Sequence, residues 1–428
     1  MAVDQSKYTK ITPAKTLQDV WQNFDPTLVI DPDSKQYISR TDSALQKLSF
    51  TLINSKHHMH AFLCGHRGSG KTTELNRLCM DENIKNKYTP IYLTAQEFGS
   101  EGVHLTHDAV MVEIGKKLSE DTNIDPDLTA EFNDWGLQIV RTFLKDESIK
   151  ASVGAKANAW IAYFKAQLST RREWKYEQKQ ILEPKVQDLI YLLNRMAQDI
   201  KNKTRKSILI VVDDLEKGES DAHKDMHKRL FQEHYDTLVQ PSFSIVYTLP
   251  IYFRAMPGSR IPNDQVFAFS AIRLYDREKR KEAPLQIETE SDGYKLIRSF
   301  VEKRIEKISN VFENDEILSQ LLLIGGGLFR ETARAIKESA YFAISRGSNL
   351  INEEDVKKVF SQIKKEYQPI VRGNAVPILK EVAETGMWVD GVEPFLQSRA
   401  VVEYENGDLW IDIRYVLKKF INELSVPA

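Results

Sequence analysis

The amino-acid sequence predicts an α/β protein built on a mostly parallel sheet. Segments with helical periodicity alternate with short apolar runs, a pattern typical of buried strands in a parallel sheet that helices cover on both faces. From residue 291 to residue 368 the pattern is helical throughout, which predicts a second, all-helical domain. The apolar, β-branched runs predict five strands, at residues 60–64, 88–94, 206–212, 242–248 and 265–270.

The other elements of the first domain follow along the chain. Residues 24–40 are rich in Asp and Pro and predict an irregular lead-in to a helix near residues 42–53. More than a hundred residues separate the second strand from the third. This stretch, about residues 102–203, shows helical periodicity, notably at residues 155–168. We therefore expect a helical insertion between these two strands.

The C-terminal part divides into two expected domains. Three consecutive glycines at residues 325–327 predict a break between helices, and Asn352 is expected to cap the last helix before residue 368. Further on, two short helical runs precede two alternating runs on either side of Asn406-Gly407, which is the strongest short-range hairpin signal. The order helix, helix, hairpin predicts a winged helix. The expected domains are residues 1–290, 291–368 and 369–428.

Length and composition exclude several classes of protein. The chain has 428 residues, 42% of them hydrophobic and 28% charged, so it can form two or three domains and is neither disordered nor fibrous. Its net charge of −2 gives no overall attraction for nucleic acid or acidic membranes. Cys64 and Cys79 are too few for a disulfide framework, and the sequence shows no signal peptide and no long apolar run. We therefore expect a cytoplasmic protein with no membrane partner.

One segment matches a phosphate-binding pattern in full. Residues 65–72 read GHRGSGKT, which fits G-x-x-x-x-G-K-[ST], and they follow an apolar strand and precede a helical run. In that context the glycines curl backbone N–H groups around a triphosphate, Lys71 reaches the β and γ phosphates, and the Thr72 hydroxyl is a ligand for Mg²⁺. His66 and Arg67 occupy variable positions and receive no chemistry of their own. The predicted cofactors are ATP and Mg²⁺, and the binding residues are Gly65, His66, Arg67, Gly68, Ser69, Gly70, Lys71, Thr72 and Thr73.

Two adjacent carboxylates end the third predicted strand. Asp213 and Asp214 follow the run SILIVV, and ligands bind at the carboxyl ends of strands in open α/β sheets. We expect Asp213 on the Mg²⁺ side, through water, and Asp214 as the group that orients or deprotonates the attacking water. Glu216 is an alternative for that second role. These residues predict a Mg²⁺-dependent ATPase with a mostly parallel P-loop NTPase sheet.

Together these features resemble the AAA+ and STAND superclass of ATPases, nearest to the branch shared by replication initiators and bacterial signalling ATPases. The likeness covers about residues 37–425 and rests on GHRGSGKT, VVDDLEK, the strand ending in IVYT, the helical region with GG-L-F-R and the expected winged helix. It implies that Tyr37 and Ile38 lie where adenine packs. The pair Asp213-Asp214 departs from the Asp-Glu common in AAA+ proteins and is nearer to the STAND side, which implies slow turnover.

The resemblance also implies roles for a threonine and three arginines. Thr248 matches the first sensor, a polar group that reports the γ phosphate, and Arg330 matches the arginine that reaches over the nucleotide from a helical lid. Arg254 and Arg260 lie where such proteins carry an arginine offered to a neighbouring subunit's ATP. A guanidinium suits that role because it always carries charge and binds phosphate bidentately. The resemblance thus implies a homo-oligomer.

The sequence leaves two functions open. The first is a nucleotide-driven switch whose helical insertion and winged helix engage a protein effector or sensor, or sister subunits, in bacterial defence or signalling. The second is a DNA-loading or transposition-type ATPase that assembles on nucleic acid. Residues 371–428 carry six Lys and Arg against nine Asp and Glu, a net charge of −3 that disfavours DNA. The basic and aromatic residues at 171–176 would favour DNA if they lined a channel.

Overall fold

The chain forms two compact units. The first comprises chiefly residues 44–64 and 75–267, and the second comprises residues 4–43, 65–74 and 268–428. The phosphate loop therefore belongs to the second unit, although the strand that leads into it belongs to the first. The computed structural model describes residues 8–31, 33–40, 43–95, 105–143, 160–161, 174–218, 220–256, 259–282 and 285–423.

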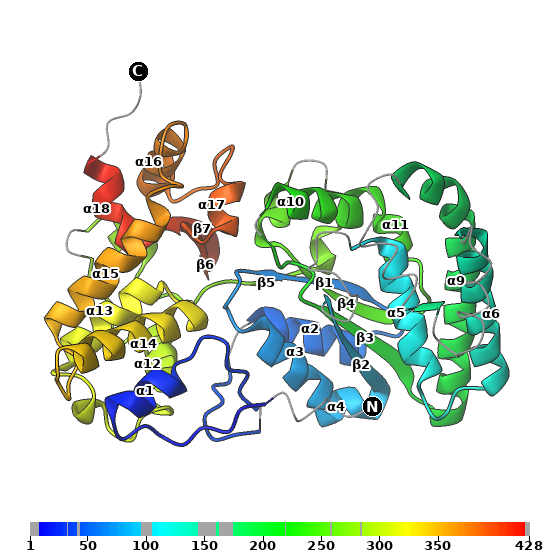
Figure 1. The fold of residues 1–428 in the computed structure, drawn as a ribbon, viewed down its shortest axis with the longest axis horizontal. Coiled ribbons are helices and arrows are strands. Elements are labelled where there is room, and N and C mark those ends of the chain that lie inside the picture. The colour runs from blue at the N-terminus through cyan, green and yellow to red at the C-terminus, as the bar shows by residue number, and fades with distance from the viewer. Residues whose placement is uncertain are drawn as a thin grey trace. The chain divides into compact units, whose positions relative to one another are not determined.

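A five-stranded sheet has the order β2-β3-β4-β1-β5 (Figure 1). The register is parallel in the pairs β2–β3, β3–β4 and β1–β4. The strands β1, β3 and β4 are buried along nearly their whole length, as apolar strands covered on both faces must be. The predicted α/β class and all five strands are confirmed, with bounds within two residues of those expected. The strands are β1 (His60–Gly65), β2 (Tyr88–Thr94), β3 (Ser207–Asp213), β4 (Ser244–Leu249) and β5 (Val266–Phe269).

Helices separate the strands, as the alternating pattern predicts. The expected first helix is α2 (Ser43–Asn54), and α3 (Lys71–Met80) and α4 (Glu82–Lys87) follow β1. Between β2 and β3 lie α5 (His107–Ser119), α6 (Pro126–Phe143) and α9 (Trp174–Thr204), which pack side by side, with α9 against β3 (Figure 1). These helices confirm a helical insertion. Arg171, Arg172 and all but residues 160–161 of the run 155–168 lie outside the described residues.

Short helical segments come directly before and after β4 in the chain. After β3 come α10 (Asp221–Lys228), the π-helical turn η3 (Arg229–Glu233) and α11 (Tyr235–Leu238). Two 3₁₀ helices, η4 (Ile251–Ala255) and η5 (Asn263–Gln265), lie between β4 and β5. This segment carries Arg254 and Arg260.

The second unit is mainly helical. Asn352 caps the helix that follows it, since its side chain accepts hydrogen bonds from the N–H groups of Glu354 and Asp355, as predicted. The helix α18, after the hairpin, was not expected from the sequence. The elements are α1 (Leu17–Asn23), η6 (Arg277–Lys281), α12 (Asp292–Glu302), η7 (Ile308–Asn310), α13 (Asp315–Gly325), α14 (Phe329–Ser345), α15 (Glu353–Tyr367), α16 (Ala375–Thr385), α17 (Glu393–Gln397), β6 (Val401–Asn406), β7 (Asp408–Ile413) and α18 (Tyr415–Glu423).

A buried ion pair joins the hairpin to the helical bundle. Arg414, just after β7, is 1% exposed and donates to Glu331 Oε2 at 2.8 Å and to the carbonyl oxygen of Ile324 at 2.6 Å. Burial alone would raise the pKa of Glu331, but the charges of Arg414 and Arg399 lower it to about 2. The pair is therefore ionised, and loss of one partner would leave a buried, uncompensated charge.

Residues 277–281, which read REKRK, include two arginines with a structural role. These residues form η6, where Arg277 donates to the carbonyl oxygen of Thr385 at 3.2 Å and Arg280 to that of Glu384 at 2.5 Å. These bonds satisfy carbonyl groups at the C-terminus of α16, which have no partner within the helix. Two of the five residues in the run thus cap a helix.

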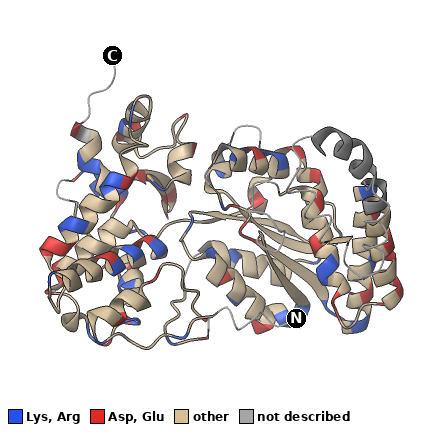
Figure 2. Ribbon diagram, viewed as in Figure 1, with Lys and Arg blue, Asp and Glu red and all other residues tan. Residues whose placement is uncertain are grey.

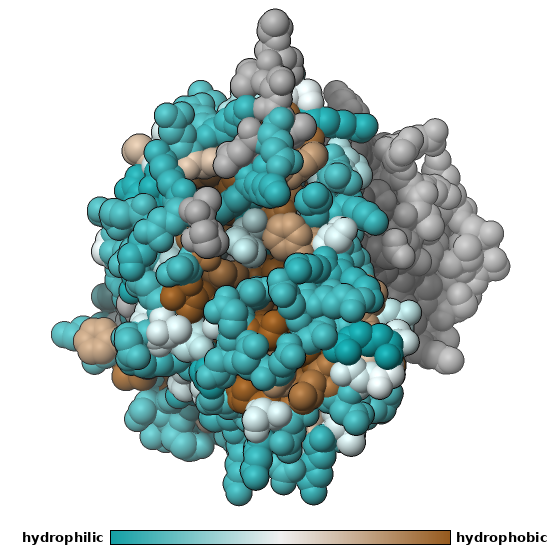
Figure 3. Space-filling view, turned by 90° about the vertical axis from the view of Figure 1, so that its left-hand side faces the viewer, coloured by the Kyte–Doolittle hydropathy of each residue, from teal (hydrophilic) through white to brown (hydrophobic). Residues whose placement is uncertain are grey.

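Charged residues of both signs are interspersed along the helices of each unit (Figure 2). On the face shown in Figure 3, hydrophilic residues predominate and hydrophobic ones emerge between them. Among the described residues, none of the helices is both long enough and apolar enough to cross a membrane.

Candidate nucleotide site

The phosphate loop runs from the end of β1 into the N-terminus of α3. Gly68 has a φ of +86°, in the left-handed region that residues with side chains rarely adopt. A Cβ atom on Gly68 would also lie 2.6 Å from the Cβ of Arg330, the second residue of α14. Glycine is thus required at position 68 for both conformation and contact. The loop ends at the start of α3, and the N-terminus of a helix favours an anion through its dipole and its first backbone N–H groups.

Lys71 lies across this loop. Its side chain is buried, and Nζ donates to the carbonyl oxygens of Gly65 at 2.9 Å and His66 at 3.1 Å. An ionised phosphate oxygen makes stronger, charge-assisted hydrogen bonds than a neutral carbonyl does. A triphosphate would therefore compete well for this ammonium group.

Arg40 supports the loop from the lead-in segment. It is 9% exposed, and it donates to the carbonyl oxygens of Ser69 at 3.1 Å and Ser270 at 2.8 Å. Its guanidinium carbon lies 3.9 Å from the ring centre of Phe269. Sequence reasoning missed Arg40, because no pattern marks a side chain whose partners are backbone carbonyls far along the chain.

His66 connects the loop to the C-terminal hairpin. Its Nε2 accepts a hydrogen bond from the backbone N–H of Glu403 in β6 at 2.8 Å, so Nδ1 carries the ring proton. Burial, with the nearby charge of Lys71, lowers the pKa of His66 to about 3. The ring is therefore neutral at physiological pH and remains an acceptor. A second bond joins the loop to the helical region, from the Arg330 N–H to the carbonyl oxygen of Gly68 at 3.2 Å.

The acidic pair lies at the carboxyl end of β3. Asp213 accepts from Tyr92 Oη on β2 at 2.5 Å and from the N–H of Asp214 at 2.7 Å. Burial and the charge of Asp213 raise the pKa of the Tyr92 phenol well above its ordinary value, so the phenol remains a donor. Asp214 pairs with Lys217 at 2.6 Å, whereas Glu216 is half-buried. The sequence did not identify Tyr92 or Lys217 as neighbours of these carboxylates.

Thr248 lies next to the acidic pair across the sheet. Val212 pairs with Tyr247 and Leu63 with Thr248, so the carboxyl ends of β3, β4 and β1 lie along one edge. Thr248 is fully buried, and its Oγ1 accepts from the N–H of Leu215 at 3.0 Å. The residue proposed as a sensor thus binds the backbone just after the two carboxylates.

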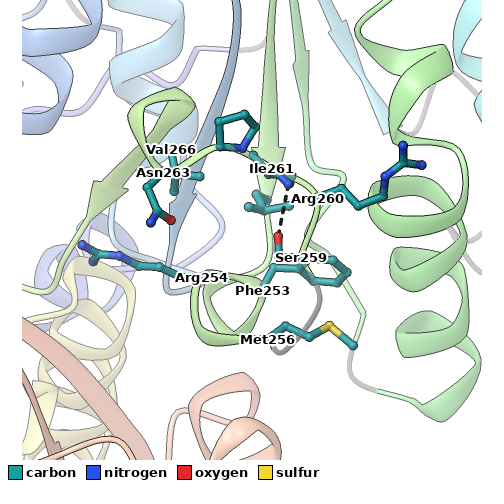
Figure 4. Close-up of a pocket in the computed structure, with 10 residues that line it drawn as sticks. Phe253, Arg254, Met256, Ser259, Arg260, Ile261, Asn263 and Val266 are labelled. Carbon is teal, nitrogen blue, oxygen red and sulfur yellow. Dashed lines mark hydrogen bonds between the residues drawn. The ribbon is translucent and has the colours of Figure 1, made fainter.

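The two candidate trans-acting arginines line one hollow of about 450 Å³. Figure 4 shows their side chains extending to opposite sides of the loop between β4 and β5. Arg260 donates to both carboxylate oxygens of Asp236, at 2.9 Å and 2.7 Å, and is about half exposed. Because the guanidinium groups diverge, they do not form a joint anion site.

Tyr37 lies beside the start of α3. Its hydroxyl donates to Glu74 Oε1, and its carbonyl oxygen accepts from Lys303 Nζ at 2.7 Å, while Ile38 is half-buried. The residues that the structure describes include no group of three or more His, Cys, Asp or Glu side chains able to hold a metal ion.

A glycine-rich loop follows the buried parallel strand β1 and precedes a helix, and β3 of the same sheet, separated from β1 by β4, ends in two carboxylates. This combination defines a P-loop NTPase domain. Residues 44–231 match the sequence profile of the KAP family P-loop domain, and the match includes the loop and the acidic pair. No curated protein matches the chain.

A comparison with solved structures found several that are similar to this chain. The Orc1 protein of Aeropyrum pernix, in complex with DNA, is 12% identical with a TM-score of 0.39, over 96% of this chain and 98% of that one. Cdc6p from Pyrobaculum aerophilum is 16% identical with a TM-score of 0.36, over 92% and 99%. A Walker-type ATPase of Pyrococcus abyssi is 13% identical with a TM-score of 0.40, over 96% and 99%.

Proposed function

We propose that the protein is an ATP-dependent switch. It binds Mg²⁺ and ATP at the phosphate loop, hydrolyses ATP slowly, and couples its nucleotide state to the binding of a protein partner or of further copies of itself. The observation that carries this proposal is the pair of hydrogen bonds from the loop to C-terminal elements, Gly68 to Arg330 and His66 to Glu403. A loop that moves to accept phosphates acts directly on α14 and β6.

The residues divide the chemistry among them. Lys71 and the loop N–H groups hold the phosphates, and Thr72 and Asp213 hold Mg²⁺, which offsets phosphate charge. Asp214 orients or deprotonates water, with Glu216 as the alternative. For Asp214, the ion pair with Lys217 favours the charged carboxylate that a base requires. Thr248, Arg330 and one arginine from a neighbouring subunit, Arg254 or Arg260, complete the proposed site.

The free energy of the two hydrogen bonds between the loop and the C-terminal elements is large enough for a switch. A net hydrogen bond contributes about 1 kcal/mol, so loss of the two loop bonds on ATP binding changes the free energy of the C-terminal contacts by about 2 kcal/mol. Coupling of that size alters partner affinity by about thirtyfold. The expected lid, residues 291–368, and the expected winged helix, residues 369–428, would carry this change to the partner.

The experiment combines binding with hydrogen exchange. We expect Lys71→Ala to abolish tight ATP binding, because it removes the cation that reaches the β and γ phosphates. Lys357→Ala is the matched control, since Lys357 is 71% exposed on α15 and forms an ion pair with Glu353 of the same helix. In the wild type, a non-hydrolysable ATP analogue should change amide exchange in residues 401–413, and Lys71→Ala should show no such change.

Two results would contradict the proposal. Unchanged ATP affinity in Lys71→Ala would refute the site, and ATP binding without any change at residues 401–413 would refute the coupling. Salt-dependent DNA binding that appears only with ATP would instead favour the DNA-loading function. The net charge of −3 over residues 371–428 leads us to expect no such binding.

A further inference from the structure

The turn that carries the acidic pair needs support from outside itself. Asp214 has a φ of +69°, in the left-handed region, which is unfavourable for a residue with a side chain. Such conformations persist only where surrounding structure holds them, and they are found often at functional sites. The question is which contacts hold this turn.

Both backbone polar groups of Leu215, the next residue, bind side chains. Its N–H donates to Thr248 Oγ1 at 3.0 Å, and its carbonyl oxygen accepts from His227 Nε2 on α10 at 2.8 Å. Leu215, Thr248 and His227 are each at most 1% exposed, so water does not compete for these bonds. Because Leu215 lies between Asp214 and Glu216, the two bonds fix the peptide planes from which both candidate carboxylates extend.

The protonation of His227 follows from its neighbours. A carbonyl oxygen only accepts, so Nε2 carries the ring proton, and Nδ1 accepts from the Tyr252 hydroxyl on η4 at 2.7 Å. Burial lowers the pKa of His227 to about 4, so the ring is neutral, and burial raises the pKa of Tyr252, which stays a donor. The Leu215 carbonyl therefore sets the tautomer, and the Tyr252 hydroxyl satisfies the nitrogen that carries no proton.

We propose that His227 is a positioning residue for ATP hydrolysis, which acts through Leu215 to orient the carboxylates of Asp214 and Glu216. The inference rests on the proposed function. His227 takes no part in ATP binding, so its loss lowers kcat and leaves KM nearly unchanged. It also joins the acidic turn to η4, the helix that carries Arg254.

Two conservative variants separate the two bonds of the ring. The amide nitrogen of His227→Gln reaches the place of Nε2 and can donate to Leu215, whereas the shorter His227→Asn reaches only the place of Nδ1 and keeps only the partner Tyr252. We expect kcat in the asparagine variant to fall about tenfold, with KM within about twofold. The glutamine variant should keep most of the wild-type kcat. Rates are compared under conditions where urea unfolding shows each variant to be fully folded.

Hydrogen exchange provides a readout that does not depend on activity. Amides in residues 213–218 should exchange faster in the asparagine variant than in the glutamine variant or the wild type. Equal kcat in both variants, or equal exchange in both, would overturn the inference. A wild-type protein that fails to hydrolyse ATP would refute the proposed function, and the exchange rates would still decide whether His227 holds the turn.

Discussion

Replacement of Gly68 by alanine tests the shape of the phosphate loop. The substitution has two costs. An alanine at a φ of +86° costs about 1–2 kcal/mol. Its Cβ would lie 2.6 Å from the Cβ of Arg330, a distance that forces the loop or the start of α14 to move and adds about 1–3 kcal/mol. We expect Gly68→Ala to lower the free energy of unfolding by about 2–5 kcal/mol and to weaken ATP binding at least tenfold.

Gly347→Ala is the matched control for the backbone cost. Gly347 has a φ of +75°, and a Cβ there would meet no atom within 4 Å, so only the conformational cost applies. Urea unfolding and ATP titration of both variants separate the two contributions. Gly68→Ala that is no less stable than Gly347→Ala, with wild-type ATP affinity, would refute the reasoning.

Second-site substitutions locate the clash. Arg330→Gly removes the Cβ that an alanine at position 68 would meet, whereas Arg330→Ala keeps it. In a double-mutant cycle, Arg330→Gly should therefore recover most of the steric cost of Gly68→Ala, and Arg330→Ala should recover little. Equal recovery by the two variants would assign the steric cost to the Arg330 side-chain atoms beyond Cβ instead.

Three further predictions concern catalysis, assembly and pH. Asp214→Asn should bind ATP but hydrolyse it at least tenfold more slowly, because an amide cannot take a proton from the attacking water. If Glu216→Gln alone shows this loss of hydrolysis, Glu216 is the residue that orients or deprotonates the water. Mixing Arg260→Ala with Lys71→Ala protein should restore some ATPase activity, because each chain supplies the intact half of a shared site. A mixture that stays inactive would exclude assembly if sedimentation at saturating ATP also shows only monomers. The folded pKa of His66, about 3, lies below its unfolded value, so the unfolded chain binds the proton first on acidification. Stability should fall as pH drops below about 6.5, by up to about 1.4 kcal/mol per pH unit from this residue, and His66→Gln should show a shallower fall in urea unfolding.

Much of the fold could be predicted because its signals are local. Each of the five strands is a short apolar run, and a parallel sheet buried on both faces requires such runs. The cap at Asn352 and the hairpin around Gly407 depend on neighbours within a few residues. The phosphate loop is likewise a local pattern, since its glycines, lysine and threonine all lie within residues 65–72. The helix α18 was missed although its own run has apolar residues at helical spacing, at positions 416, 417, 420 and 421.

The contacts that support the site could not be predicted in this way. The bond between His66 and Glu403 spans 337 residues, and those of Arg40 reach Ser69 and Ser270, 29 and 230 residues away. The His227 bond ends on the backbone of Leu215, where any residue type would serve.

The sequence by itself thus determined the class of the sheet, the position of the phosphate loop and the two carboxylates that follow β3. Only the tertiary structure decided which C-terminal elements bind the loop and which side chains hold the acidic turn. The physical reason is that these bonds join a side chain to a backbone amide or carbonyl. Every residue except proline carries both groups, so the partner leaves no mark in the sequence until folding brings it within about 3 Å.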